Sequence, residues 1–248
     1  MPLINPAITQ WIRQMADSDQ AVACHAYQCL QEEVFHVSRP GEEAAQTALA
    51  TALGEALVAQ AKPGPGARSR RAASSRNNLA RLLSYLPLEA AAPYLARALN
   101  DLEVREMARQ ALESNPSERA TGALLTALDA AGPAFCAGVI NSLAKRTGER
   151  VAAALRRAAQ DRQFQVRMAA LLALADFPEP SHDAILEKAA KAASARERRM
   201  AHRARARLAE TLRATGNQPA AHRICNAILS SHAPEPQKKA ARPALRMS

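Results

Sequence analysis

The stretch DRQFQVRMAALLALADFPEP, Asp161 to Pro180, decides the fold because it is one unit of an internal repeat. Its central part, VRMAALLAL at 166–174, aligns with VREMARQAL at 104–112, and both read Val-Arg-x-x-Ala-x-x-Ala-Leu. The two copies lie 62 residues apart, and half that step leads to FCAGVINSL at 135–143, whose apolar residues keep the same phase. A period in the thirties with helical spacing predicts an α-solenoid of stacked helix pairs.

Composition also favours helices throughout. Ala, Leu and Arg are prominent, and these residues lose little side-chain entropy in a helix. The chain has 248 residues, of which 48% are hydrophobic, so it can bury a sizeable core. Only 3% are aromatic, and the alternation typical of strands is nearly absent. We therefore expect an all-α protein.

Each repeat begins with a further helix. Segments with helical spacing precede the repeat cores at 92–101, 120–132, 149–161 and 181–194, and segments 42–61 and 72–86 form another expected pair. Prolines stand at the starts of these segments and in the turns between them, where they are tolerated. They are Pro87, Pro93, Pro116, Pro133, Pro178, Pro180 and Pro219.

The pattern Leu-x-x-Ala-Leu-x-Asp, followed by Val-Arg-x-x-Ala-x-x-Ala-Leu, resembles HEAT repeats of the bacterial HEAT-like or PBS-lyase type. The resemblance covers about residues 6–212 and is best at 93–112 and 151–174. It implies a superhelix of about six antiparallel helix pairs, and we expect a final capping helix at 218–231. It also implies a structural role for Asp101, Arg105, Asp161 and Arg167, through bonds within and between repeats.

The domain organisation follows from this pattern and from local composition. We expect one repeat array over residues 1–232, interrupted by a long basic loop at 62–77, and a disordered basic tail at 233–248. The N-terminus lacks the features of a secretory signal, and the longest apolar run, 168–175, is too short to span a bilayer. A cytoplasmic protein without membrane contact is the expectation.

Motifs of catalysis or cofactor binding are missing from the sequence. It has no glycine-rich phosphate loop and no nucleophile elbow, and its four Cys and six His are not spaced as metal ligands. HEAT-like DNA glycosylases use a Trp beside the DNA, but Trp11 is placed here as a core residue. We therefore expect a protein that is not an enzyme and needs no cofactor.

Charge is segregated along the chain. Residues 62–81 carry six basic residues and no acid, 188–213 carry nine basic and two acidic residues, and 234–248 carry four and one. These segments together hold +16 against +10 for the whole chain, so the remainder is acidic. Within 195–216, Arg199, Arg203 and Arg207 recur every four residues beside an apolar stripe, and such like-charge pairs cost about 0.2–0.5 kcal/mol each.

A basic surface of this kind indicates an anionic partner, unless the arginines form a merely solvated face. We expect Arg198 and Arg205 to lie on the same polar side of the helix as Arg199, Arg203 and Arg207. The candidate contact residues are Arg68, Arg70, Arg71, Arg76, Arg198, Arg199, Arg203, Arg205 and Arg207. The leading hypothesis is a scaffold that binds a protein, acidic where it meets arginine, through its concave and partly basic surface. One alternative is a solenoid that binds nucleic acid without sequence preference, through phosphates. Another, which rests on the resemblance alone, is an accessory role like that of chromophore lyases.

Overall fold

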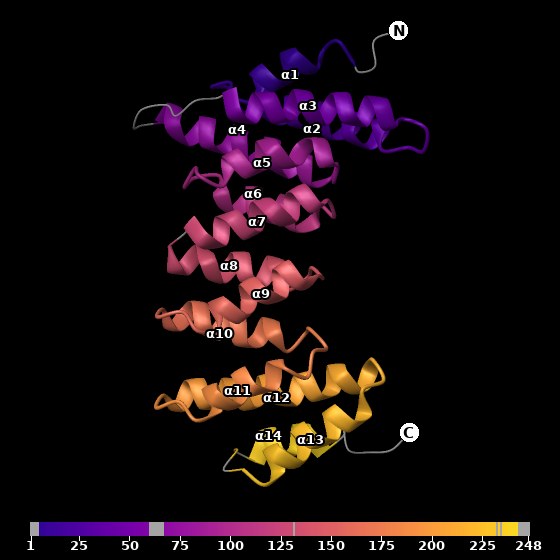
Figure 1. Ribbon diagram of the computed structural model, residues 1–248. Helices are drawn as coiled ribbons and strands as arrows, with labels where there is room; N and C mark the ends of the chain where they lie inside the picture. The colour runs from indigo at the N-terminus through magenta and orange to yellow at the C-terminus, as the bar shows by residue number, and fades with distance from the viewer. Residues whose placement is uncertain (1–4, 60–66, 131, 232, 234, 243–248) are drawn as a thin grey trace. The chain divides into compact units, whose positions relative to one another are not determined.

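The computed structural model describes residues 5–59, 67–130, 132–231, 233 and 235–242 of the chain (Figure 1). The described residues form fourteen α-helices and one short 3-10 helix, and none of them lies in a strand, so the all-α prediction is confirmed. The chain divides into two compact units, residues 1–129 and 130–248.

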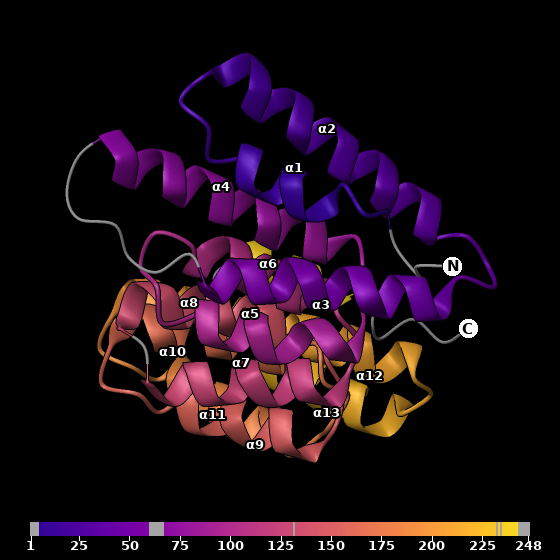
Figure 2. The ribbon, with the colours of Figure 1, turned by 90° about the horizontal axis from the view of Figure 1, so that it is seen from above.

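The first unit is built from antiparallel helix pairs. Its helices are α1 (Ile8–Gln14), α2 (Gln20–Val37), α3 (Glu43–Ala59), α4 (Ala67–Ser84), η1 (Glu89–Ala91), α5 (Ala92–Ala98), α6 (Arg105–Ser114) and α7 (Glu118–Ala130). Helices α1 and α2, α3 and α4, and α5 and α6 pack as pairs. Across pairs, α1 contacts α3 and α3 contacts α5, while α2 contacts α4 and α4 contacts α6. First helices therefore stack in one layer and second helices in another (Figures 1 and 2).

The second unit repeats this arrangement. Its helices are α8 (Pro133–Leu143), α9 (Glu149–Ala158), α10 (Phe164–Leu174), α11 (His182–Ala190), α12 (Ala195–Ala214), α13 (Gln218–Leu229) and α14 (Glu235–Ala241). Helices α9 and α10, and α11 and α12, pack as pairs, and the second helices α8, α10 and α12 contact each other in sequence. Each unit is thus a HEAT-like α-solenoid array, as the sequence predicts.

The opening stretch contains α10 and the turns on either side of it. Val166, Ala170, Leu171 and Leu174 are buried, so the repeat's apolar residues form the core face of this helix. Asp161 Oδ1 accepts a hydrogen bond from the Gln163 N–H at 2.7 Å. Asp101 accepts from the Glu103 N–H in the same way at 3.0 Å, so the repeat's Asp shapes the turn before the second helix in both of these pairs.

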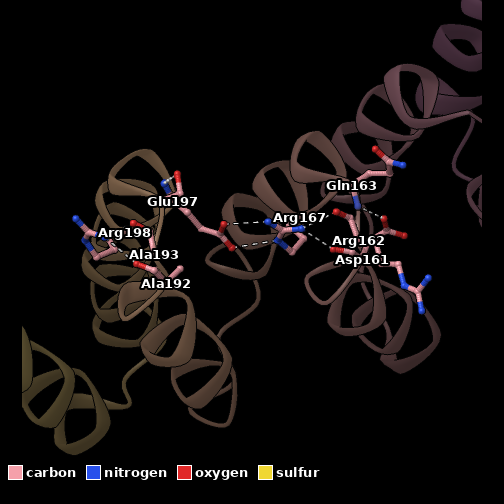
Figure 3. A network of polar contacts seen from close by, with 9 residues as sticks. Asp161, Arg162, Gln163, Arg167, Ala192, Ala193, Glu197 and Arg198 are labelled. Carbon is pink, nitrogen blue, oxygen red and sulfur yellow. Dashed lines mark hydrogen bonds and ion pairs between the residues drawn. The ribbon is translucent and has the colours of Figure 1, made fainter.

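Arg167 links successive pairs of the second unit. Its guanidinium donates to the carbonyls of Asp161 and Arg162, and it forms a two-pronged ion pair with Glu197 of α12, at 3.1 and 3.0 Å (Figure 3). The side chain therefore ties α10 to its own preceding turn and to the next pair. This agrees with the structural role expected for the repeat's Arg.

Two sequence-based boundaries were wrong. The basic segment 62–77 is not a loop throughout, because α4 begins at Ala67 and includes 72–77, which the sequence also assigned to the expected helix 72–86, while 60–66 lie outside the described residues. Its Ala and Arg content favours a helix more than its charge opposes one. Within the tail expected to be disordered, 235–241 form α14, which packs on α12 and α13 and buries Ala241 completely.

A glycine sets the close approach of α3 and α5 in the first unit. A Cβ atom at Gly54 of α3 would overlap the ring of Tyr94 in α5. The missing side chain therefore leaves the space that the aromatic ring fills.

Candidate interaction surfaces

Helix α12 separates an apolar side from a charged one. Ser194 caps it by accepting a hydrogen bond from the Glu197 N–H. Ala204, Leu208 and Leu212 are fully buried, as their four-residue spacing predicts. The helix is thereby fixed with its remaining side toward solvent.

Three exposed arginines occupy that side, and we call Arg196, Arg199 and Arg203 the arginine stripe. At 3.6 residues per turn they fall within an arc of about 60°. Arg199 and Arg203 have no ion-pair partner among the described residues. The Arg196 guanidinium lies 5.5 Å from the centroid of the Phe164 ring, a cation–π contact that leaves its charge uncompensated. The stripe is therefore a surface of positive charge.

The other predicted residues of α12 are already engaged. Arg207 is exposed but pairs with Asp176 at 2.5 Å. Arg198 donates to the carbonyls of Ala192 and Ala193, at 2.8 and 2.6 Å, and so holds the turn before its helix (Figure 3). These two arginines contribute less free charge than the sequence suggests.

Arg205 does not lie on the polar side where the sequence placed it. Only 3% of it is exposed, and it forms a two-pronged ion pair with Asp183 of α11, at 2.6 and 3.0 Å. Two residues of helix rotate it by about 200° from Arg203, which turns it into the contact with α11. Arg205 therefore stabilises the α11–α12 pair and is not available to contact a partner.

The arginines of α4 divide in the same way. Arg70 and Arg71 are exposed, whereas Arg76 is 4% exposed and pairs with Asp101 and Glu103 in the turn before α6. Arg76 thus joins successive pairs, as Arg167 does in the second unit. The side chain of Arg68 lies outside the described residues.

A cavity that the sequence did not reveal lies in the first unit. Its volume is about 590 Å³, and it is lined by the turn after α1 together with residues 20–31 of α2 and 71–78 of α4. The lining residues are Met15, Asp17, Ser18, Gln20, Ala23, Cys24, Tyr27, Gln28, Gln31, Arg71, Ser74 and Asn78. The spacing of 71, 74 and 78 on one side of α4 was a possible signal, but nothing in the sequence pairs α4 with α2.

Tyr27 connects this cavity to an exposed aromatic pair. The pKa of Tyr27 is raised, first by burial and then by the neighbouring Tyr85 phenol, while Arg81 beside it acts in the opposite direction. Tyr85 in turn lies against Phe35 of α2, with ring centroids 6.5 Å apart. Gln31, which also lines the cavity, lies one helical turn before Phe35, so the cavity and the aromatic pair are neighbours, and we call the two together the α2/α4 groove.

Metal-binding and titratable groups were also located. No group of three His, Cys, Asp or Glu side chains that could hold a metal occurs within the described part of the chain. Cys29 Sγ lies 3.6 Å from His25 Nε2 on the same helix, and Cys24 faces solvent. Cys225 is a fully buried core residue, and burial raises the pKa of its thiol to about 11. No helix in the described ranges is long and apolar enough to cross a membrane.

Comparison with known proteins gives neighbours among solved structures only. No family model and no curated protein matches the chain. The complex of CpcE and CpcF of phycocyanin lyase from Nostoc is 20% identical, with 97% of this chain and 94% of that chain covered and a TM-score of 0.46. Human deoxyhypusine hydroxylase is 16% identical, with 96% and 94% covered and a TM-score of 0.38.

A designed armadillo repeat protein is similar too, with 18% identity, 96% and 98% coverage and a TM-score of 0.40. The chain's own stacked helix pairs place it in the class of HEAT-like α-solenoids.

Proposed function

We propose that the protein is a non-catalytic interaction scaffold whose arginine stripe on α12 binds an acidic surface of a partner protein. One observation carries the proposal. Arg199 and Arg203 are exposed and lack a carboxylate partner within the described residues, although nearby arginines of the same helix pair with Asp176 and Asp183.

The energetics of the stripe support a partner. Arginines three or four positions apart on a helix repel each other, at a cost of about 0.2–0.5 kcal/mol per pair. A carboxylate placed between two of them relieves this repulsion and accepts charge-assisted, two-pronged hydrogen bonds. Acidic groups of a partner are thus the complement that this face lacks.

The number of free arginines favours protein over nucleic acid. With Arg76 and Arg205 buried, the stripe offers three uncompensated guanidiniums, fewer than the about six to ten phosphate contacts of strongly salt-dependent DNA-binding proteins. The described part of the stripe also offers Phe164 alone as an aromatic neighbour, and its ring already contacts Arg196 and Arg167. Single-stranded nucleic acids are usually held by several exposed aromatic side chains.

Charge reversal tests the proposal. We expect R199E/R203E to lose capture of acidic proteins, measured by quantitative pull-down at low salt, by about tenfold or more. The matched control is R150E/R223E, which changes the same number of exposed arginines in the same unit. Equal capture by both variants would contradict the proposal.

A salt series with labelled duplex DNA tests the alternative. Three phosphate contacts would give a log–log slope of about −3, measured by fluorescence anisotropy. If this slope appears and R199A/R203A flattens it, the stripe binds phosphate and the proposal fails. Absence of binding at low salt leaves the acidic protein as the partner to identify.

A further inference from the structure

The α2/α4 groove in the first unit is a second candidate binding site, independent of the arginine stripe. It combines a polar cavity at one end with an exposed aromatic pair at the other (Figure 2 shows α2 and α4 from above). The cavity lies between residues 20–31 of α2 and 71–78 of α4, and the aromatic pair joins residue 35 of α2 to residue 85 just after α4. Both helices therefore run in the same direction along the groove.

The polar end matches an extended peptide backbone. Four amide side chains line the cavity, from Gln20, Gln28, Gln31 and Asn78, and each carries both a donor and an acceptor. The peptide groups of an extended chain also offer both, unpaired, at every residue. A helical ligand satisfies these groups internally and would leave the amides without partners.

The charge around the cavity favours an acidic ligand. Arg71 lines it, Arg70 is exposed beside it, and Arg81 follows further along the same helix, which contains no acid. The one acid that lines the cavity, Asp17, already accepts a hydrogen bond from the Asp19 N–H at 2.9 Å. Arg71 has no ion-pair partner among the described residues, so its charge is open to a carboxylate of the ligand.

The aromatic end provides an apolar contact. Phe35 is 65% exposed and Tyr85 is 46% exposed, and they are two of the three large hydrophobic residues that the described chain leaves in solvent. They lie side by side, although they come from distant parts of the sequence. Exposed aromatic residues of this kind, next to a polar rim, are typical of interaction sites.

We propose that the α2/α4 groove binds an extended segment of a partner protein that carries an acidic residue and, about six residues away, an apolar or aromatic residue. The spacing follows from the helix. From Arg71, which meets the acidic residue, to Tyr85 the rise along α4 and its end is about 21 Å, at 1.5 Å per residue. An extended peptide covers that distance in about six residues, at 3.3 Å each.

Selection from a random twelve-residue peptide display library tests this directly. We expect the enriched peptides to share an acid separated by about six positions from an apolar or aromatic residue. Synthetic copies should bind the full-length protein in fluorescence anisotropy. Enrichment of no peptide, or of peptides without an acid, would overturn the proposal, and so would peptides whose pattern is that of an amphipathic helix.

Two variants locate the binding. We expect F35S/Y85S to lower the affinity for the synthetic peptides by about tenfold. In R71E a carboxylate at position 71 repels the acidic residue of the peptide. Selection on this variant should therefore no longer enrich acidic peptides. Both changes are at exposed side chains, and circular dichroism should show an unchanged fold.

Matched control variants in the same unit distinguish binding in the groove from binding elsewhere on the surface. Leu102, which is 76% exposed, and Arg97, also exposed, lie outside the groove, so L102S and R97E should bind the peptides as the wild type does. If L102S and R97E lose as much peptide affinity as F35S/Y85S and R71E do, the peptides bind outside the groove. R199E/R203E should leave peptide binding unchanged, so failure here and failure of the stripe are distinguishable.

Discussion

Arginines of the same helix have opposite roles, and burial distinguishes them. Arg205 pairs with Asp183 inside the α11–α12 pair, whereas Arg203, two residues away, faces solvent. We expect R205A to lower the free energy of unfolding by about 3–5 kcal/mol, because it leaves Asp183 unpaired in a partly buried position. R203A should change it by less than about 0.5 kcal/mol. Urea denaturation followed by circular dichroism measures both, and equal losses would contradict these assignments.

His202 gives the stability a dependence on pH. Burial, and then the charge of Arg205, lower the pKa of its imidazole below the usual 6.5. The unfolded chain therefore binds this proton more readily, so stability falls as the pH drops below about 6.5 and levels off below the folded-state pKa.

The variant H202Q removes this contribution. In urea titrations between pH 7.5 and pH 5, we expect its stability to change less with pH than that of the wild type. Other groups titrate equally in both proteins, so the difference isolates His202. Parallel curves for the two proteins would show that the imidazole has no lowered pKa.

At the scale of single elements, the sequence predicted which segments are helical better than where each helix begins and ends. The 3.6-residue spacing identified α6 and α10 because their buried residues follow it directly. Segments 67–71 and 235–241 lacked that clear spacing, and their charge suggested loop and disorder. Tertiary contacts outweighed the charge there, since α4 packs on α3 and α6, and α14 packs on α12 and α13.

The last helix provides a test of such contacts. Ala241 is fully buried, while Ala240 beside it is exposed. We expect A241E to detach α14 from α12, because a carboxylate cannot be buried there without a partner. Hydrogen exchange of residues 235–241 should then become fast, and A240E should leave it slow. Slow exchange in both variants would show that α14 does not depend on this contact.

The candidate sites were also predictable only in part, because they depend on contacts between helices that are far apart in the sequence. The sequence indicated the exposed Arg199 and Arg203, because periodicity places them opposite buried leucines. It could not separate them from Arg205, because the partner of Arg205 lies 22 residues away in another helix. The α2/α4 groove depends on contacts between α2 and α4, which are 30 residues or more apart along the chain.

At the scale of the whole molecule, the two units each contain their own core. In repeat arrays, stability comes from contacts within a helix pair and with its neighbours. We expect a fragment of residues 1–130 to fold alone, with helical circular dichroism and a cooperative thermal transition. A matched fragment of residues 1–98 ends after α5 and lacks α6, the partner of both α5 and α4, so it should melt at a lower temperature. An unfolded 1–130 fragment would show that the cores are not independent.

The contact between Gly54 and Tyr94 also has an evolutionary consequence. Because the ring occupies the volume that a side chain at position 54 would need, neither residue can change freely while the other stays. Among descendants of a common ancestor, a larger residue at position 54 should therefore occur together with a smaller one at position 94. Such paired replacement would record, in inherited sequence, the distance at which α3 and α5 are packed.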